Sequence, residues 1–174
     1  MKKILIAAAM LTLADSMYAK SDTEKIGDIL SATIPIAAYG TTLYLDDEEG
    51  QYQFYKSYGT TLAVTFALKY TVQEKRPDSD DTDSFPSGHT SSAFSGATFI
   101  YKRYGFKYAA IPYLCAIYTG YSRVYSDRHF THDVIAGALI GTASSWFFTI
   151  PYKNLNITPE VGAGYKGLQF NYKW

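Results

Sequence analysis

Residues 86–101 read PSGHTSSAFSGATFIY, a stretch that predicts both the start of a helix and an anion site. Proline restricts the backbone before the helix, and serine at position 87 is a residue type that caps helix N-termini. The first amides of a helix point outward with a partial positive charge and can bind anions. His89 lies in the first turn, where an imidazole can meet a bound phosphate ester. A capped helix start with an exposed histidine is the alternative interpretation.

Four further helices are expected around this one. Ser21-Asp22-Thr23-Glu24 has the spacing of a capping box and predicts a helix that begins there and runs towards residue 45. The other helices are expected over residues 53–73, 105–123 and 131–148, with a solvated turn at 46–50. Because the connections are short, successive helices should pack antiparallel. The predicted fold is all-α, an antiparallel bundle of about five helices with a short C-terminal β-hairpin tail.

The tail, residues 154–174, alternates between apolar and polar side chains, which is typical of strands with one covered face. A two-residue turn at Lys166-Gly167 would pair Tyr165 with Leu168 and place the apolar side chains on one face of a hairpin. An isolated hairpin is only marginally stable in water. Its apolar face therefore needs a cover, either the helical bundle or a membrane.

The N-terminus has the features of an export signal. Lys2 and Lys3 precede an apolar run, residues 4–13, that is short for a membrane span. Small residues follow, with cleavage expected after Ser16 or Ala19; an uncleaved anchor helix is the alternative. The predicted organisation is a signal peptide (1–19), a helical domain (20–153) and the amphipathic tail (154–174).

The charge balance gives no sign of a nucleic-acid partner, because 16 basic and 16 acidic residues occur without a lysine- or arginine-rich run. Mean hydropathy is near neutral at −0.12, and few apolar runs reach the roughly 20 residues that a span needs. The 17 tyrosines and 10 phenylalanines suit a helical core or a membrane interface. We expect an exported protein of a bacterium, in the periplasm or at a cell-envelope membrane; an integral inner-membrane protein is the alternative. The sequence does not indicate an oligomeric state.

Two more elements supply groups that suit phosphate chemistry. His129 and Asp133 are spaced one helical turn apart, so the carboxylate can hold one ring nitrogen, and leave the other free as a nucleophile, if the helix begins early enough. Lys69, Arg76 and Arg123 are placed singly; the planar fork of arginine matches phosphate oxygens, and lysine adds a point charge. Lys69 follows an apolar run, where a cation is costly without an anionic partner. Ordinary solvated ion pairs are the alternative.

Two features near these elements have simpler explanations. His132 is expected to point about 90° away from Asp133 around the helix and to be structural, with a supporting role left open. An acidic connection holds Asp78, Asp80, Asp81 and Asp83. A solvated turn explains it best, and the glycine and distal glutamate of a calcium loop are missing. Our hypothesis is that this connection edges the site and disfavours highly anionic substrates.

In this order, K-x6-RP, PSGH and SR-x5-H-x3-D resemble the signature of the type 2 phosphatidic acid phosphatase superfamily. This superfamily also contains the class A bacterial acid phosphatases and the vanadium haloperoxidases. Every fixed position is matched between residues 69 and 133, and the helical pattern extends the resemblance to roughly residues 22–150. The resemblance implies a helical bundle with the site between helix ends.

The resemblance also implies a phosphoric monoester hydrolase that needs no metal or cofactor. By family analogy, His129 attacks phosphorus and forms a phosphohistidine, Asp133 supports it, and His89 protonates the leaving oxygen and then activates water. The implied phosphate-binding groups are Lys69, Arg76, Arg123, Ser87 and Gly88. Two histidines of different protonation predict a bell-shaped pH profile.

The substrate is expected to be a phosphorylated lipid, including lipid pyrophosphates, or a small phosphate ester, and a membrane surface is a candidate partner. Phosphatidate, phosphatidylglycerophosphate, undecaprenyl pyrophosphate, lipid A and soluble esters all stay open. One alternative is a vanadate-dependent haloperoxidase, although that group typically has a much larger chain. Another is a non-catalytic envelope scaffold or phosphate-binding protein, which would not need both His89 and His129.

Overall fold

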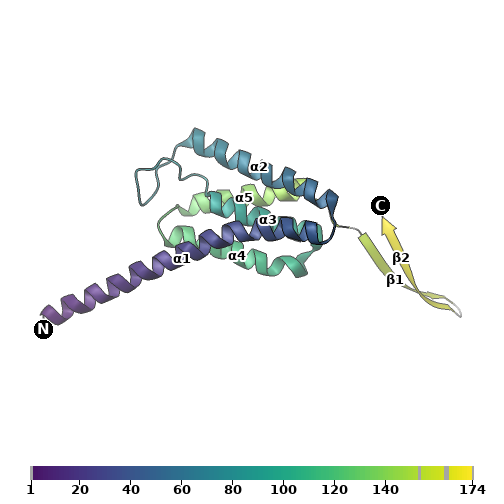
Figure 1. Ribbon diagram of the computed structural model, residues 1–174, viewed down its shortest axis with the longest axis horizontal. Coiled ribbons are helices and arrows are strands. Elements are labelled where there is room, and N and C mark those ends of the chain that lie inside the picture. Colours follow the sequence, from purple (N-terminus) through teal and green to yellow (C-terminus); the bar gives the residue numbers. More distant parts are fainter. Residues whose placement is uncertain (1, 153, 163–164, 174) are drawn as a thin grey trace.

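The computed structural model describes the backbone of residues 2–152, 154–162 and 165–173, and the side chains of residues 21–152. Within these residues the helices are α1 (Lys2–Tyr44), α2 (Glu48–Val72), α3 (Gly88–Tyr104), α4 (Phe106–Tyr125) and α5 (Thr131–Phe148). They form one bundle in which α3 packs against each of the other four, and α1 extends beyond it at its N-terminal end (Figure 1). The predicted bundle of about five helices is confirmed.

Two predicted helix starts are wrong. The Ser21-Asp22-Thr23-Glu24 segment lies inside α1 instead of opening a helix, because the chain is already helical before it. Helix α2 begins at Glu48, within the expected solvated turn. The side chain of Asp47 is buried and accepts a hydrogen bond from the Gly50 amide at 3.0 Å, which caps this helix start. The predicted signal peptide stays a prediction.

Hydrogen bonds between side-chain hydroxyl groups connect the helices inside the bundle. Side-chain hydrogen bonds link α3 to its neighbours through Thr61–Ser95 (3.1 Å), Thr65–Ser91 (3.0 Å), Tyr58–Ser92 (2.9 Å) and Ser95–Ser145 (2.9 Å). On the outside, α4 exposes Ile111, Leu114 and Ile117. Small residues and hydroxyl pairs at helix contacts are common between helices in membranes. Among the described residues, however, no helix is both long and apolar enough to cross a bilayer.

Helices α3 and α5 approach each other closely through two glycines. A Cβ at Gly137 would lie 2.5 Å from the carbonyl oxygen of Ser87, and one at Gly141 would lie 2.2 Å from that of Ser91. Side chains at these positions would force the helices apart. Close contact places the first turn of α5 beside the N-terminus of α3, where the Ser87 amide donates to the Asp133 carbonyl at 3.0 Å. Two of the sequence motifs therefore meet here.

A buried ion pair closes the other end of the bundle. The side chains of Arg103, near the end of α3, and Asp47, before α2, are each only 3% exposed. Arg103 Nε donates to Asp47 Oδ2 at 2.7 Å, and the Tyr104 hydroxyl donates to the same oxygen at 2.9 Å. Arg103 also donates to the Ile150 carbonyl, beyond α5, at 3.0 Å. This pair ties together the ends of α2, α3 and α5.

In the tail, β1 (Asn154–Gly162) and β2 (Tyr165–Lys173) pair antiparallel. Their register pairs Gly162 with Tyr165 and Glu160 with Gly167, so Lys166 and Gly167 lie within β2. The predicted turn at Lys166-Gly167 is therefore wrong. The side chains of this tail lie outside the described residues, and its amphipathic character stays a prediction.

Candidate active site

Helix ends from α2, α3 and α5 meet at one pocket of about 380 Å³. Five of the residues that the sequence singled out line it together, namely Lys69, Arg76, Gly88, His89 and His129. Asp83 lines it as well. The remaining wall comes from α1, α2 and α3 and includes Ala32, Tyr58, Leu62 and Phe66. Cations and imidazoles therefore share one pocket with an apolar wall.

The side chains of Asp133 and Ser84 contact the His129 ring on its Nδ1 side. Its Nδ1 lies 3.4 Å from Asp133 Oδ2, and the Ser84 hydroxyl donates to the same carboxylate oxygen at 2.5 Å. The Phe130 amide adds a third contact to this oxygen at 2.9 Å. His129 is 3% exposed and Asp133 is fully buried. These contacts orient the ring through Nδ1 and leave Nε2 on the side away from the carboxylate.

Both histidines of the pocket are biased towards the neutral form. Burial lowers the pKa of His129 to about 4; the positive charges of Lys69 and Arg76 act in the same direction, and Asp133 opposes them. Partial burial also lowers the pKa of His89, helped by the charge of Arg123 and opposed by that of Asp28. A neutral His129 suits a nucleophile, because its lone pair is available.

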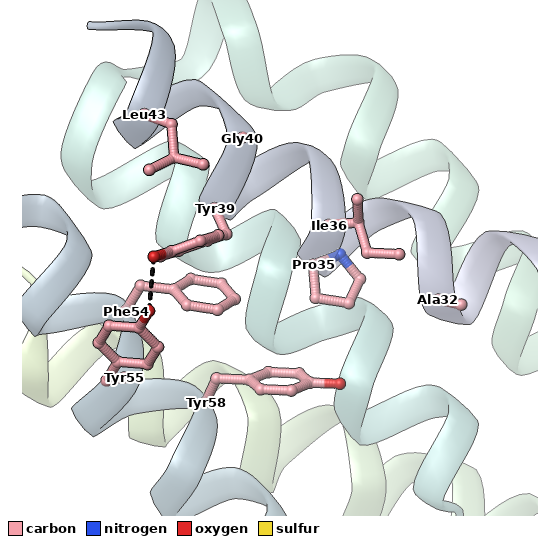
Figure 2. Close-up of a pocket in the computed structure, with 9 residues that line it drawn as sticks. All are labelled: Ala32, Pro35, Ile36, Tyr39, Gly40, Leu43, Phe54, Tyr55 and Tyr58. Carbon is pink, nitrogen blue, oxygen red and sulfur yellow. Dashed lines mark hydrogen bonds between the residues drawn. The ribbon is translucent and has the colours of Figure 1, made fainter. Parts of the chain in front are cut away.

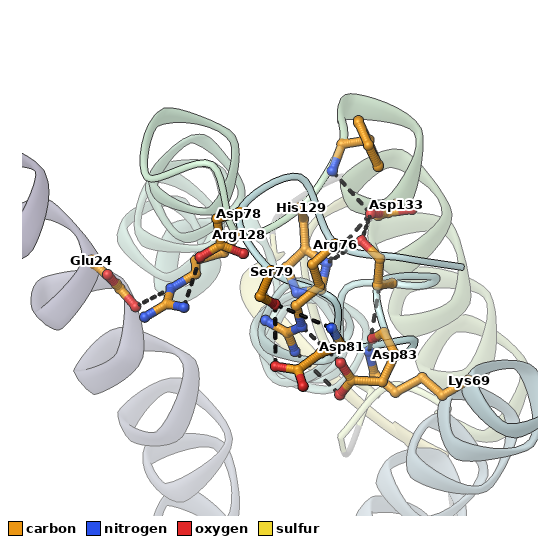
Figure 3. Close-up of polar contacts among 12 residues, drawn as sticks. Glu24, Lys69, Arg76, Asp78, Ser79, Asp81, Asp83, Arg128, His129 and Asp133 are labelled. Atoms are coloured by element: carbon orange, nitrogen blue, oxygen red, sulfur yellow. Dashed lines mark hydrogen bonds and ion pairs between the residues drawn. The ribbon is translucent and has the colours of Figure 1, made fainter. Parts of the chain in front are cut away.

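The acidic connection between α2 and α3 is tied down by ion pairs. Arg76 binds both carboxylate oxygens of Asp83, at 2.7 and 3.2 Å, and the Lys69 ammonium donates to the Asp83 carbonyl (Figure 3). Arg128 bridges Asp78 at 2.8 Å and Glu24 of α1 at 2.7 Å. All four aspartates of this connection are exposed, so the predicted solvated turn is confirmed, and the ion pairs hold it in place. The connection does edge the site, as hypothesised, because Asp83 lines the pocket.

A carboxylate from α1 also contacts the site residues, although no sequence pattern predicts it. Asp28 Oδ1 accepts a hydrogen bond from Arg123 Nη1 at 2.7 Å and lies 3.2 Å from His89 Nε2. The Arg123 side chain is only 2% exposed, and it also donates to the Glu24 carbonyl at 2.6 Å. Asp28 therefore contacts an expected phosphate ligand and the expected acid at once. Ser84 was missed for the same reason, since nothing in a single serine predicts its contact with Asp133.

Comparison with known proteins identifies the family. The family model described as the PAP2 superfamily matches residues 53–156. The chain is also 32% identical to the lipid A 4'-phosphatase of Helicobacter pylori over 169 residues, which cover 87% of this chain and 85% of that one. The chain belongs to the PAP2 superfamily. The resemblance inferred from the three motifs is thereby confirmed.

Two other known proteins match less of the chain or only its fold. The lipid A 1-phosphatase of Porphyromonas gingivalis is 41% identical over 78 residues, which are 43% of this chain and 18% of that protein. The crystal structure of LpxE from Aquifex aeolicus superposes with a TM-score of 0.64 at 24% identity, over 75% of this chain and 85% of that one. This structural likeness supports the helical fold.

Ser87 of the PAP2 signature and the neighbouring His132 have defined places. The Ser87 side chain is buried and caps α3, accepting from the Thr90 amide at 3.5 Å, so the predicted cap is confirmed. Its predicted contact with phosphate stays a prediction. His132 was expected to point away from Asp133, but its exposed ring contacts the buried carboxylate. Its Nε2 lies 3.2 Å from Asp133 Oδ1 and 2.9 Å from Glu74 Oε1.

Proposed function

We propose that this chain hydrolyses the phosphate monoester of a lipid through a phosphohistidine on His129. The observation that carries this proposal is the shared pocket, in which two imidazoles and two cations face an apolar wall. Lipid A is the leading substrate candidate, because the relative from Helicobacter pylori that matches most of this chain is a lipid A 4'-phosphatase. The reaction class is phosphoric monoester hydrolysis.

In the first step, His129 Nε2 attacks phosphorus as the bond to the leaving oxygen breaks. His89 gives its proton to that oxygen, and the lipid alcohol leaves. A bound phosphate dianion favours the protonated form of His89, which offsets the lowering of its pKa by burial. Asp133 stabilises the charge that develops on the His129 ring.

In the second step, neutral His89 takes a proton from water as the water oxygen attacks the phosphohistidine. The P–N bond breaks, inorganic phosphate leaves and His129 is restored. Lys69, Arg76 and Arg123 neutralise the phosphoryl oxygens in both steps, with the Gly88 amide beside them. Because the arginines are paired with Asp83 and Asp28 in the free protein, the phosphate takes the place of these carboxylates.

An apolar groove gives the lipid a place beside the phosphate. The groove, of about 430 Å³, lies between α1 and α2 (Figure 2) and is lined by Ala32, Pro35, Ile36, Tyr39, Gly40, Leu43, Phe54, Tyr55 and Tyr58. It shares Ala32 and Tyr58 with the phosphate pocket. An acyl chain would therefore run from the pocket along this groove, where apolar burial contributes to binding.

We place this activity at a bacterial cell-envelope membrane, after export directed by residues 1–19. Exposed apolar side chains on α4, among them Ile111, Leu114 and Ile117, would contact lipid there. The amphipathic hairpin tail would add to this contact. Fractionation of cells that express the chain with a C-terminal tag, followed by salt and detergent extraction, tests the location.

The decisive experiment measures phosphate release from lipid A, phosphatidate and a soluble aryl phosphate by the wild type and the His129→Gln variant. The proposal expects release from at least one lipid, with lipid A preferred, and none by the variant. Activity on the soluble ester alone would refute the lipid assignment. No release from any substrate, with phosphate still bound, would make the chain a phosphate-binding scaffold.

A further inference from the structure

A second cluster of charged side chains lies against the oxygen of Asp133 that faces away from His129. It consists of Glu74, just beyond α2, with His132 and Asp133 in the first turn of α5. His132 Nε2 lies 2.9 Å from Glu74 Oε1 and 3.2 Å from Asp133 Oδ1. One donor atom from each of the three lies within 4.8 Å of the others. None of the steps proposed above uses Glu74 or His132.

One atom of this cluster lacks the partner that its burial requires. Asp133 Oδ1 is buried in a fully buried side chain and accepts no hydrogen bond, although His132 Nε2 is within ion-pair distance. The other oxygen of the same carboxylate accepts two hydrogen bonds, from the Ser84 hydroxyl and the Phe130 amide. Leaving a charged oxygen unpaired in the interior is costly, so a buried atom of this kind indicates a missing cationic partner.

We propose that Glu74, His132 and Asp133 bind a divalent transition-metal cation of the Zn²⁺ type. One imidazole and two carboxylates are donors that zinc accepts, and the two carboxylates balance its charge. Zinc bonds of about 2.0–2.2 Å in a tetrahedral site place neighbouring donors roughly 3.3 Å apart. The observed 2.9 and 3.2 Å separations are close to this spacing.

The surroundings suit entry and retention of such an ion. The His132 side chain is 58% exposed and Glu74 is 30% exposed, so an ion and its water ligand can reach the buried oxygen from solvent. The rings of Phe85 and Phe130 pack near the His132 ring, with centroids 6.1 and 5.4 Å away, and limit its movement. The Glu74 carbonyl is held by the Ser84 amide at 2.9 Å.

The expected consequence is inhibition, and this part rests on the proposed function. A cation at Asp133 Oδ1 would draw negative charge away from Oδ2, which supports the nucleophile. The His129 ring would then lose stabilisation as positive charge develops on it. The bound ion would therefore inhibit the reaction without taking part in the chemistry.

Zinc binding is measured first, without turnover. Isothermal titration calorimetry with ZnCl₂ is run on the full chain after chelator treatment, in phosphate-free buffer. We expect one ion per chain, with affinity at least about tenfold weaker in His132→Gln and in Glu74→Gln. The control Glu48→Gln, which changes an exposed carboxylate at the start of α2, should bind as the wild type does. No saturable binding by the wild type, or equal binding by all four proteins, would overturn the site.

Inhibition is measured next, with each protein normalised to its own zinc-free rate. Zinc should inhibit the wild type and Glu48→Gln, chelation should restore the rate, and the midpoint should rise at least about tenfold in the other two variants. Circular dichroism checks that each variant folds. If His132→Gln does not fold, Glu74→Gln decides the question. Zinc binding without inhibition would refute the proposed inhibitory role. A chain without any phosphatase activity would refute the proposed function, and the calorimetry would still decide the metal site.

Discussion

The two ends of the bundle both pair arginine with aspartate, yet the pairs differ in burial and in their contacts. At the far end, Arg103 and Asp47 are each 3% exposed and share further hydrogen bonds with surrounding groups. At the site end, Arg76 is 21% and Asp83 53% exposed. A buried pair that loses one member leaves an unpaired charge in the interior, whereas water or an anion can replace a half-exposed partner. An arginine–aspartate pair thus stabilises the fold at one end, whereas at the other end, under the proposed function, phosphate replaces the aspartate of such a pair.

Substitutions at the site end should lower the catalytic rate strongly but change the free energy of unfolding little. Replacing His129 by Gln removes the nucleophile and is expected to lower kcat by at least about 1,000-fold. The measurement is phosphate release under saturating substrate, with the thermal unfolding midpoint recorded in parallel. A variant that keeps a comparable rate would contradict the mechanism, and one that fails to fold would contradict the division between the two ends.

The far end should behave in the opposite way. Asp47→Asn leaves the buried Arg103 with only the exposed Glu49 carboxylate, 3.8 Å away, as a counter-charge, and is expected to lower the free energy of unfolding by about 3 kcal/mol. The matched change at the site end, Asp83→Asn, should cost about 1 kcal/mol or less, because that pair is half exposed. Denaturant titrations of both variants test this difference. Similar losses of stability at the two positions would show that burial does not determine how much each ion pair stabilises the fold.

Acid should destabilise the site end through His129. Its folded pKa of about 4 lies below the ordinary value of 6.5, so the unfolded chain binds the proton more tightly. Stability is therefore full above pH 6.5 and falls as the pH drops towards 4, by about 3 kcal/mol in total. Denaturant midpoints across this range test the prediction. The His129→Gln variant should lose this part of the pH dependence. If its stability falls with pH as steeply as that of the wild type, groups other than His129 cause the loss.

The smallest effect is expected at Asp28. Asp28→Asn removes a half-exposed competitor for Arg123, so inorganic phosphate should inhibit about two- to fivefold more strongly. The variant also loses a charge that raises the pKa of His89, so the alkaline limb of the kcat profile should move to lower pH. Asp22→Asn, an exposed change on the same helix, is the control. An unchanged limb would mean that Asp28 does not act on His89.

Much of the site could be predicted because its groups are local motifs. The cap at Ser87 follows from its place at the start of α3, and the pairing of His129 with Asp133 follows from their spacing of four residues, with His129 just before α5. The start of α2 was misplaced because Asp47 is acidic, and its burial depends on Arg103, 56 residues away. Likewise, Asp28 reaches Arg123 across 95 residues.

The sequence by itself therefore determined the family, the helical class and the residues expected to handle phosphate, because each depends on residue type and short spacing. The tertiary structure alone decided which carboxylates complete the site and which pair closes the far end. It brought Asp28 to His89, turned His132 towards Asp133, and joined an apolar groove to the phosphate pocket. These outcomes depend on how the helices pack, since burial and contact between distant segments arise only when the bundle has formed.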